Sequence, residues 1–233
     1  NGGDKRLADI AVKHAETTMH HHFREDALVG VGGVDGPDVF AFAQHRNAVG
    51  DLKHLAELVE KQGISTGFPG MPYLLFALAD NGQEEETFRT LFKDTCPSWL
   101  YQVKAGGTTF WERWDAMRED GSVNQGGGGG MVSFNHYAAG AVCDFLYRRI
   151  AGIEATSGGY KTFKIAPLVG GGLTAAKGEV NSPYGKIVSD WKIEGNAFVI
   201  DVTVPVSATC ALTLPNGENK TLKSGHYRFQ CKI

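Results

Sequence analysis

The sequence lacks several features that would point to particular classes of protein. No apolar run approaches the roughly 20 residues that cross a bilayer, so we expect no membrane-spanning helix and no membrane partner. Lys and Arg are scattered among a slight excess of acids, with a net charge of −3. No basic stripe occurs, which argues against nucleic acid and suits a neutral polar ligand.

Cysteine is also scarce. The four cysteines form no C-x-x-C pair, which argues against a structural zinc site and against a disulfide scaffold in a chain of this size. Cys210 and Cys231 are close enough in the C-terminal region to lie on neighbouring strands, and a disulfide between them stays open. The run His20–His22 cannot point one way on a helix and has no second ligand cluster. We therefore predict no metal and no cofactor.

The first 150 residues have a helical hydrophobic period. Apolar residues recur at i, i+3 and i+4 in several short segments, which are predicted to be helices at 7–15, 51–61, 71–79, 84–92 and 134–150. Pro72 suits a first helical turn, and Gly152 is expected to stop the last helix. Because segment 71–79 is apolar around most of its circumference, we expect it in an inner layer of a barrel or bundle of paired helices.

The hydrophobic period changes to two from about Ser157. Segments rich in Val, Ile, Thr and Phe are predicted to be strands at 161–165, 187–193, 197–204 and 209–214. Glycine-rich turns separate them, as in an antiparallel β-sandwich. The 233 residues are enough for two modest domains. We predict a helical region at 1–154 and a C-terminal β-sandwich at 155–233.

One segment, Gly106–Asp115, concentrates unusual chemistry. Trp111 and Trp114 flank Glu112 and Arg113. Tryptophan rings stack on sugar rings, and a carboxylate between them can activate water or stabilise a cationic transition state. The alternative is a buried aromatic pair with a Glu112–Arg113 salt bridge, and these residues alone favour that alternative.

A second polar cluster, residues 131–140, follows the five glycines Gly126–Gly130, which we interpret as a linker at the rim of a site. Ser133 is predicted to be the N-cap of a long helix. Asn135 and His136 would then lie in its first turn, where the positive end of the helix dipole favours a neutral histidine that hydrogen-bonds a hydroxyl. The alternative is a histidine satisfied within the helix packing.

The order of the motifs resembles the α-L-rhamnosidases of glycoside hydrolase family 78. The resemblance runs from about Thr66 to Ile193. It consists of the motifs T-G-F-x-G-x-P, P-S-W-x-Y-x-V, G-x-T-T-x-W-E-R-W-D, S-F-N-H-Y-A-x-G-A-V, A-G-I, G-Y-K and I-A-P, in this order. One such motif would be weak evidence, whereas the ordered set is specific.

The resemblance implies an (α/α)6 barrel followed by a C-terminal β-sandwich. It also implies inverting hydrolysis of terminal α-L-rhamnosides, so the expected partners are L-rhamnose-containing glycosides. Glu112 matches the family's general base, and His136 matches a substrate-binding residue. Trp111, Trp114 and Asn135 are assigned to substrate binding because they neighbour these two residues.

The sequence departs from the family pattern in one important respect. The acidic motif that carries the family's general acid is absent, and about seven helices before residue 150 are too few for six pairs. We therefore expect a fragment that holds the later half of the barrel and is inactive alone. Its inner helices would expose apolar residues such as Leu74, Leu75 and Phe76, which we predict to be covered by a second copy or by the missing half.

Two alternatives remain at this point. The first is a carbohydrate-binding protein without catalysis, built on a glycosidase-like scaffold, since an absent acid fits it equally well. The second is a related α/α-barrel hydrolase that acts on pieces of rhamnogalacturonan. The cellular compartment, periplasmic or secreted against cytoplasmic, stays open.

Overall fold

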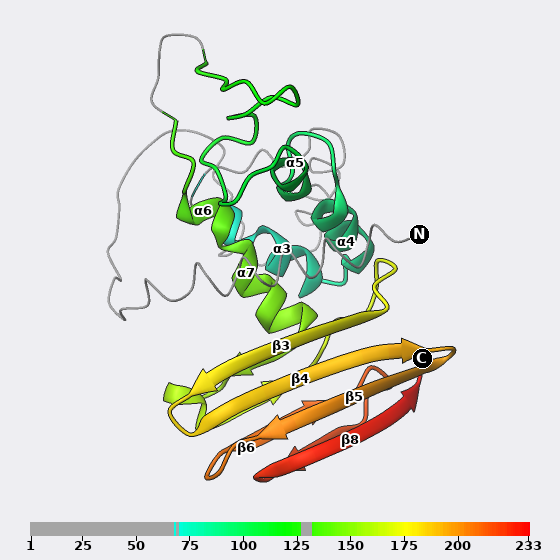
Figure 1. The fold of residues 1–233 in the computed structure, drawn as a ribbon. Helices are drawn as coiled ribbons and strands as arrows, with labels where there is room; N and C mark the ends of the chain where they lie inside the picture. Colours follow the sequence, from blue (N-terminus) through cyan, green and yellow to red (C-terminus); the bar gives the residue numbers. More distant parts are fainter. Residues whose placement is uncertain (1–67, 69, 127–131) are drawn as a thin grey trace, which may run out of the picture. The chain divides into compact units, whose positions relative to one another are not determined.

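The computed structural model describes residues 68, 70–126 and 132–233 (Figure 1). The chain divides into two compact units between Val142 and Cys143, and each is considered by itself. The helices predicted at 7–15 and 51–61 and the run His20–His22 lie outside the described residues.

The helical unit contains two helices whose bounds agree with the prediction (Figure 1). They are α3, Met71–Ala79, and α4, Glu84–Phe92. Pro72 lies in the first turn of α3, where its missing N–H is not needed. Three glutamates begin α4 at the positive end of its dipole. The buried apolar side chains of these helices are Met71, Leu74, Leu75, Leu78, Phe88 and Leu91.

A third helix, α5 (Trp99–Lys104), was not predicted, because six residues are too few for a clear period. Such a short helix depends on contacts outside itself. Ser98 caps it by accepting the Tyr101 backbone N–H at 3.0 Å. The Trp99 indole donates to the Ala139 carbonyl at 2.9 Å, and the Tyr101 hydroxyl donates to the Met117 carbonyl at 3.0 Å. These bonds anchor α5 to two later parts of the chain.

The prediction of a single long helix at 134–150 is wrong in two respects. The helical segment begins later, and it is divided into three elements. Helix α6 (Tyr137–Gly140) has His136 as its N-cap, so Ser133 lies outside it. It is followed by α7 (Val142–Phe145) and the π-helical turn η2 (Leu146–Ile150). Gly152 ends the segment as predicted. It has φ +81°, and a Cβ there would lie 2.5 Å from the Pro167 nitrogen.

The expectation of exposed apolar faces on α3 is also wrong. Leu74 and Leu75 are 2% and 3% exposed, and Phe76 is half-buried. These side chains therefore need no second copy to cover them, and self-association stays an untested prediction.

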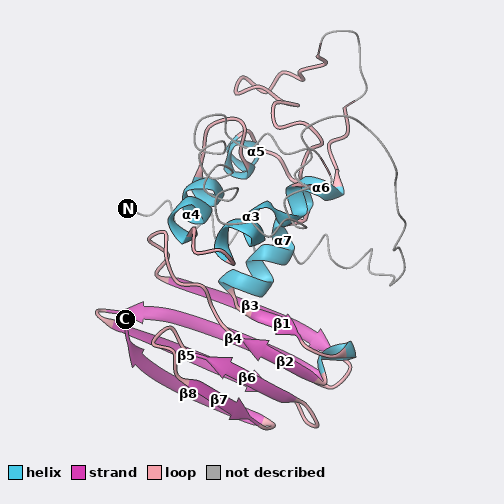
Figure 2. Cartoon of the chain, turned by 180° about the vertical axis from the view of Figure 1, so that it is seen from behind, coloured by secondary structure: helices cyan, strands magenta, loops and turns pink. Residues whose placement is uncertain are grey.

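The C-terminal unit contains two four-stranded sheets (Figure 2). The first has the order β1-β2-β6-β7, with β1 Ile153–Ala155, β2 Thr162–Ile165, β6 Thr209–Thr213 and β7 Asn219–Leu222. The second has the order β3-β4-β5-β8, with β3 Ala175–Ser182, β4 Gly185–Glu194, β5 Ala197–Val204 and β8 Gly225–Lys232. A 3-10 turn, η3 (Gly158–Tyr160), precedes β2. The predicted antiparallel sandwich is confirmed, with one parallel pair, β2 and β6.

Alternating side chains of the two sheets form one core. It includes Ile165 and Leu212 from the first sheet and Trp191 and Ile200 from the second, all 1% exposed or less. Burial of this kind contributes about 1.5–3 kcal/mol for each large apolar side chain. The inward alternation is what the period of two in the sequence predicts.

Cys210 and Cys231, for which a disulfide was left open, lie in different sheets and form no disulfide. Cys210 is in β6 and Cys231 is in β8, and both are buried. Burial raises the pKa of the Cys210 thiol to about 12. Both residues therefore serve as small apolar core side chains.

Two buried hydrogen bonds join the end of η2 and the residue after it to the second sheet. The Trp191 indole donates to the Ile150 carbonyl at 2.8 Å, and the Ser189 hydroxyl donates to the Ala151 carbonyl at 2.7 Å. The last carbonyls of a helix have no partner within it, so these two side chains of β4 satisfy groups that burial would otherwise leave unbonded.

Glu154 of β1 is the centre of a group of cations. Its carboxylate oxygens form ion pairs with a nitrogen of Arg148 at 2.8 Å, of Arg149 at 2.9 Å and of Lys164 at 2.8 Å. Burial alone would raise the pKa of Glu154. The bonds from Lys164, Arg148 and Arg149 outweigh it and hold the pKa at about 2.

Glu154→Gln should therefore lower the stability of the sandwich unit and flatten its acid dependence. The depressed pKa stabilises the folded state above the unfolded value of 4.5, by about 2–3 kcal/mol, and that contribution is lost as pH falls through 4.5 toward 2. Urea denaturation at several pH values, followed by the backbone amide NMR signals of strands β4 and β5, measures it. Glu218→Gln, which removes an exposed carboxylate, is the control. An unchanged acid slope in Glu154→Gln would contradict this role.

Candidate active site

The two motifs singled out in the sequence lie side by side in the helical unit. We call residues 109–112 and 133–136 the paired segments. The His136 N–H donates to the Phe110 carbonyl at 2.8 Å, and the Glu112 N–H donates to the Ser133 carbonyl at 2.9 Å. The Thr109 hydroxyl also donates to the Phe134 carbonyl. Residues more than 20 positions apart in the chain are thus fixed next to one another by backbone bonds.

Among the described residues, only one oxygen of the Glu112 carboxylate accepts a hydrogen bond. Its Oε2 accepts the Ser133 backbone N–H at 3.1 Å, so Glu112 and Ser133 bond to each other twice. Within the described ranges, Oε1 accepts no hydrogen bond, and the side chain is partly exposed. A carboxylate in this arrangement is oriented by the backbone and keeps one oxygen available to bind a water molecule.

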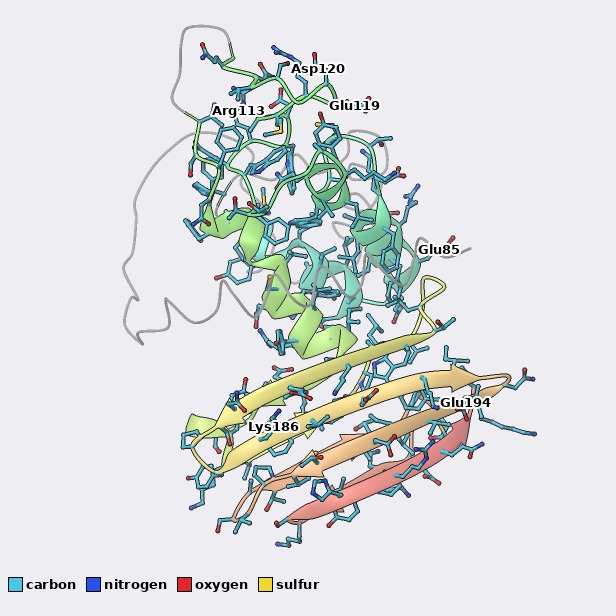
Figure 3. All side chains as sticks on the ribbon, in the orientation of Figure 1. Glu85, Arg113, Glu119, Asp120, Lys186 and Glu194 are labelled. Carbon is cyan, nitrogen blue, oxygen red and sulfur yellow. The ribbon has the colours of Figure 1, made fainter. Side chains whose placement is uncertain are left out.

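Arg113 does not pair with Glu112, so the salt bridge of the alternative interpretation is wrong. Its Nη2 lies 3.0 and 3.2 Å from the two carboxylate oxygens of Asp115. Asp115 also accepts the Asn124 side-chain amide at 2.7 Å. Gly126 lies against the guanidinium, and a Cβ there would be 2.6 Å from Nη1. Figure 3 labels Arg113 together with Glu119 and Asp120 of the following loop.

Trp111 is a core residue in the structure. Its side chain is 2% exposed and meets the Phe134 ring edge-on at 5.8 Å. Gly107 lies so close that an added Cβ would be 2.9 Å from the indole. The ring therefore has no open face for a sugar, and the burial does not support the predicted stacking role.

Trp114 differs from Trp111, because it is only half-buried. It packs edge-on against Trp99, with ring centroids 5.3 Å apart and an angle of 88° between the planes. The buried Trp111–Trp114 pair of the alternative interpretation is therefore wrong, because Trp114 packs on Trp99 and Trp111 packs on Phe134. Part of the Trp114 ring stays accessible.

His136 is oriented by its capping bond. Its Nδ1 accepts the Ala138 backbone N–H at 3.3 Å, which leaves Nε2 as the ring nitrogen that can donate a hydrogen bond. That N–H is a donor suited to a hydroxyl. Asn135 is exposed, and its backbone N–H and carbonyl both bond the Ser133 hydroxyl, at 3.2 and 3.0 Å.

Gln102 is a structural support that sequence reasoning missed. It is 1% exposed, and its Oε1 accepts the Trp111 backbone N–H at 2.9 Å. Its backbone carbonyl accepts the Gly107 N–H, also at 2.9 Å. Gln102 thus holds both ends of the loop that leads to Glu112. The only indication in the sequence was its place inside the motif P-S-W-x-Y-x-V.

In the part of the chain that the structure describes, no group of three or more His, Cys, Asp or Glu side chains is arranged to hold a metal ion. No helix there has the length and apolarity needed to cross a membrane. The paired segments hold one oriented carboxylate, Glu112, in the same backbone ladder as the donor His136, an arrangement that glycoside hydrolases use.

Comparisons with known proteins agree with this class. The model of the bacterial α-L-rhamnosidase six-hairpin glycosidase domain matches residues 39–150, and the model of the bacterial α-L-rhamnosidase C-terminal domain matches residues 152–229. The chain belongs to the bacterial α-L-rhamnosidase family.

Individual relatives carry the same name. An α-L-rhamnosidase of Formosa agariphila is 36% identical over 71% of this chain and 18% of its own length, and one of Streptomyces avermitilis is 36% identical over 79% and 18%. The chain thus spans about a fifth of the length of these relatives.

Solved structures give the same result. The native α-L-rhamnosidase of Aspergillus terreus has a TM-score of 0.74 at 32% identity, covering 84% of this chain and 23% of that one. The Streptomyces avermitilis enzyme complexed with L-rhamnose has a TM-score of 0.73 at 32% identity, covering 79% and 20%. The predicted family and the predicted fold, part of a helical barrel followed by a β-sandwich, are confirmed. The division between residues 154 and 155 and the site residues stay predictions.

Gln102→Leu should destabilise the helical unit by about 1–3 kcal/mol, because it leaves the buried Trp111 N–H without an acceptor. Amide hydrogen exchange at Trp111 should become faster, and the midpoint of urea unfolding should fall to a lower concentration. Lys104→Ala is the matched control on the same helix, since it removes only an exposed ion pair with Asp94. Equal behaviour of the two variants would show that Gln102 does not support the loop.

Proposed function

We propose that the natural protein containing this chain removes terminal α-L-rhamnose from glycosides by inverting hydrolysis, with Glu112 as the general base. The proposal rests on the geometry of the Glu112 carboxylate. Its Oε2 accepts the Ser133 N–H, whereas its Oε1 accepts no hydrogen bond within the described residues. Support also comes from the relatives named α-L-rhamnosidase and from the neighbour solved with L-rhamnose.

In such a reaction the base takes a proton from a water molecule that attacks the anomeric carbon. A carboxylic acid on the opposite face protonates the departing oxygen, roughly 6.5–9.5 Å from the base. The acidic motif expected to carry that acid does not occur in the 233 residues. We propose that the acid lies outside this chain and that the chain alone is inactive.

The other residues of the site have supporting roles in this proposal. The His136 Nε2–H donates to a hydroxyl of the bound sugar, because Nδ1 is already occupied by the Ala138 N–H. Asn135 and the accessible part of Trp114 border the sugar. Trp111 contributes through its backbone and its packing, since its ring is buried.

Glu112→Gln in the natural protein should depress turnover of p-nitrophenyl α-L-rhamnoside by about 10²–10⁴-fold. KM should stay close to the wild-type value, because glutamine keeps an oxygen that can accept the Ser133 N–H. Glu119→Gln is the matched control, as it changes an exposed carboxylate in the same part of the chain.

Steady-state kinetics and NMR of the first-formed sugar test the proposal together. Wild type should release the β-anomer first, and the 233-residue chain alone should release no nitrophenol. Unchanged turnover in Glu112→Gln would remove Glu112 from the mechanism. Binding of L-rhamnose by a natural protein that hydrolyses no rhamnoside would favour a carbohydrate-binding protein instead.

A further inference from the structure

Three rings gather at His136, the last residue of the paired segments. The His136 ring is tilted against Phe68, with centroids 4.5 Å apart and planes at 34°, and stacks on Tyr137, with centroids 5.1 Å apart and planes at 22°. Tyr137 is the first residue of α6, whose position is marked in Figure 1. We call Phe68, His136 and Tyr137 the aromatic shelf.

The shelf is unusually open for side chains of this size. Phe68 is 41% exposed and Tyr137 is 73% exposed. Large apolar rings in contact with water lose the free energy that burial would provide. When such rings gather on one surface and adjoin polar groups, they commonly mark a ligand-binding surface.

The polar group within the shelf is the His136 Nε2–H. Its Nδ1 is fixed by the helix cap, so the imidazole cannot turn its donor away without losing the bond to Ala138. The shelf therefore combines flat ring faces with a fixed donor. This combination suits a cyclic ligand that carries oxygen atoms, such as a phenolic or sugar ring.

The shelf is also linked to the proposed base. His136 bonds Phe110, and Ser133 bonds Glu112, so both sets of residues belong to the same paired segments. The chain from Ser133 to His136 can span at most about 10 Å. The shelf therefore lies beside the carboxylate, close enough for one glycoside molecule to reach both.

We propose that Tyr137, the exposed end of the aromatic shelf, binds the ring of the leaving group while His136 contacts the rhamnose, and that Tyr137 thereby determines preference for rhamnosides with a ring-bearing leaving group. This inference rests on the proposed function. Base-activated water attacks the face of the sugar opposite the leaving group. The leaving group thus points away from Glu112. In this proposal it lies against the exposed Tyr137 ring, which packs on His136.

The test compares two substrates of the natural protein, p-nitrophenyl α-L-rhamnoside and α-L-rhamnosyl fluoride, whose leaving group has no ring. Tyr137→Ala should lower kcat/KM for the aryl substrate by about 3- to 10-fold, as expected for loss of one aromatic pair. It should change kcat/KM for the fluoride by less than about twofold. Tyr137→Phe keeps the ring and should behave as wild type on both. Tyr73→Ala, which removes a tyrosine that is 60% exposed on α3, should affect neither substrate.

Each other outcome overturns the inference in a distinguishable way. Equal losses for both substrates would place Tyr137 at the rhamnose ring or in folding. Wild-type kinetics of Tyr137→Ala on the aryl substrate would remove the shelf from leaving-group binding while the proposed function stands. A wild-type protein that hydrolyses neither substrate would contradict the proposed function itself, and the shelf inference with it.

Discussion

The candidate site depends on the reciprocal bonding of Glu112 and Ser133. The backbone N–H of Glu112 donates to the Ser133 carbonyl, and the Ser133 N–H donates back to the Glu112 carboxylate. A hydrogen bond to a charged acceptor is stronger than one between neutral groups, so this pair both closes the paired segments and orients the carboxylate. The position of His136 follows, because its own N–H bonds Phe110 in the same ladder.

The support for this pair comes from α5, a helix of six residues. Gln102 fixes the Trp111 backbone, and the Trp111 ring fills the space that Gly107 leaves free. Burial of the tryptophan thus holds the residue that precedes the carboxylate. The sandwich unit is organised separately, around its own core and the Glu154 cluster.

Local patterns in the sequence predicted the regular parts well. The bounds of α3, α4 and β5 follow from apolar periods and from Pro72 and the initial glutamates of α4. Strand β3 was missed because its sequence, A-A-K-G-E-V-N-S, has little of the Val, Ile and aromatic content of a typical strand. Helix α5 was missed because its stability comes from distant contacts such as Trp99 with Ala139.

The candidate site could be located from its motifs, whereas the partners of its side chains could not. Arg113 pairs with Asp115 because the chain turns there, and no spacing rule distinguishes that carboxylate from Glu112. The helix after the glycines begins at Tyr137 because His136 itself provides the cap. Trp111 and Trp114 look equivalent in the sequence, yet Gly107 and Phe134 bury only the first.

A crystal structure of the natural protein with L-rhamnose bound tests the central claim most directly. The account predicts that Glu112 Oε2 stays on the Ser133 N–H, while Oε1 faces the anomeric carbon and holds either a water molecule or the O1 hydroxyl of β-L-rhamnose, and His136 Nε2 donates to a sugar hydroxyl. A Glu112 carboxylate that is turned away from the sugar, or paired with Arg113 in place of Ser133, would contradict it.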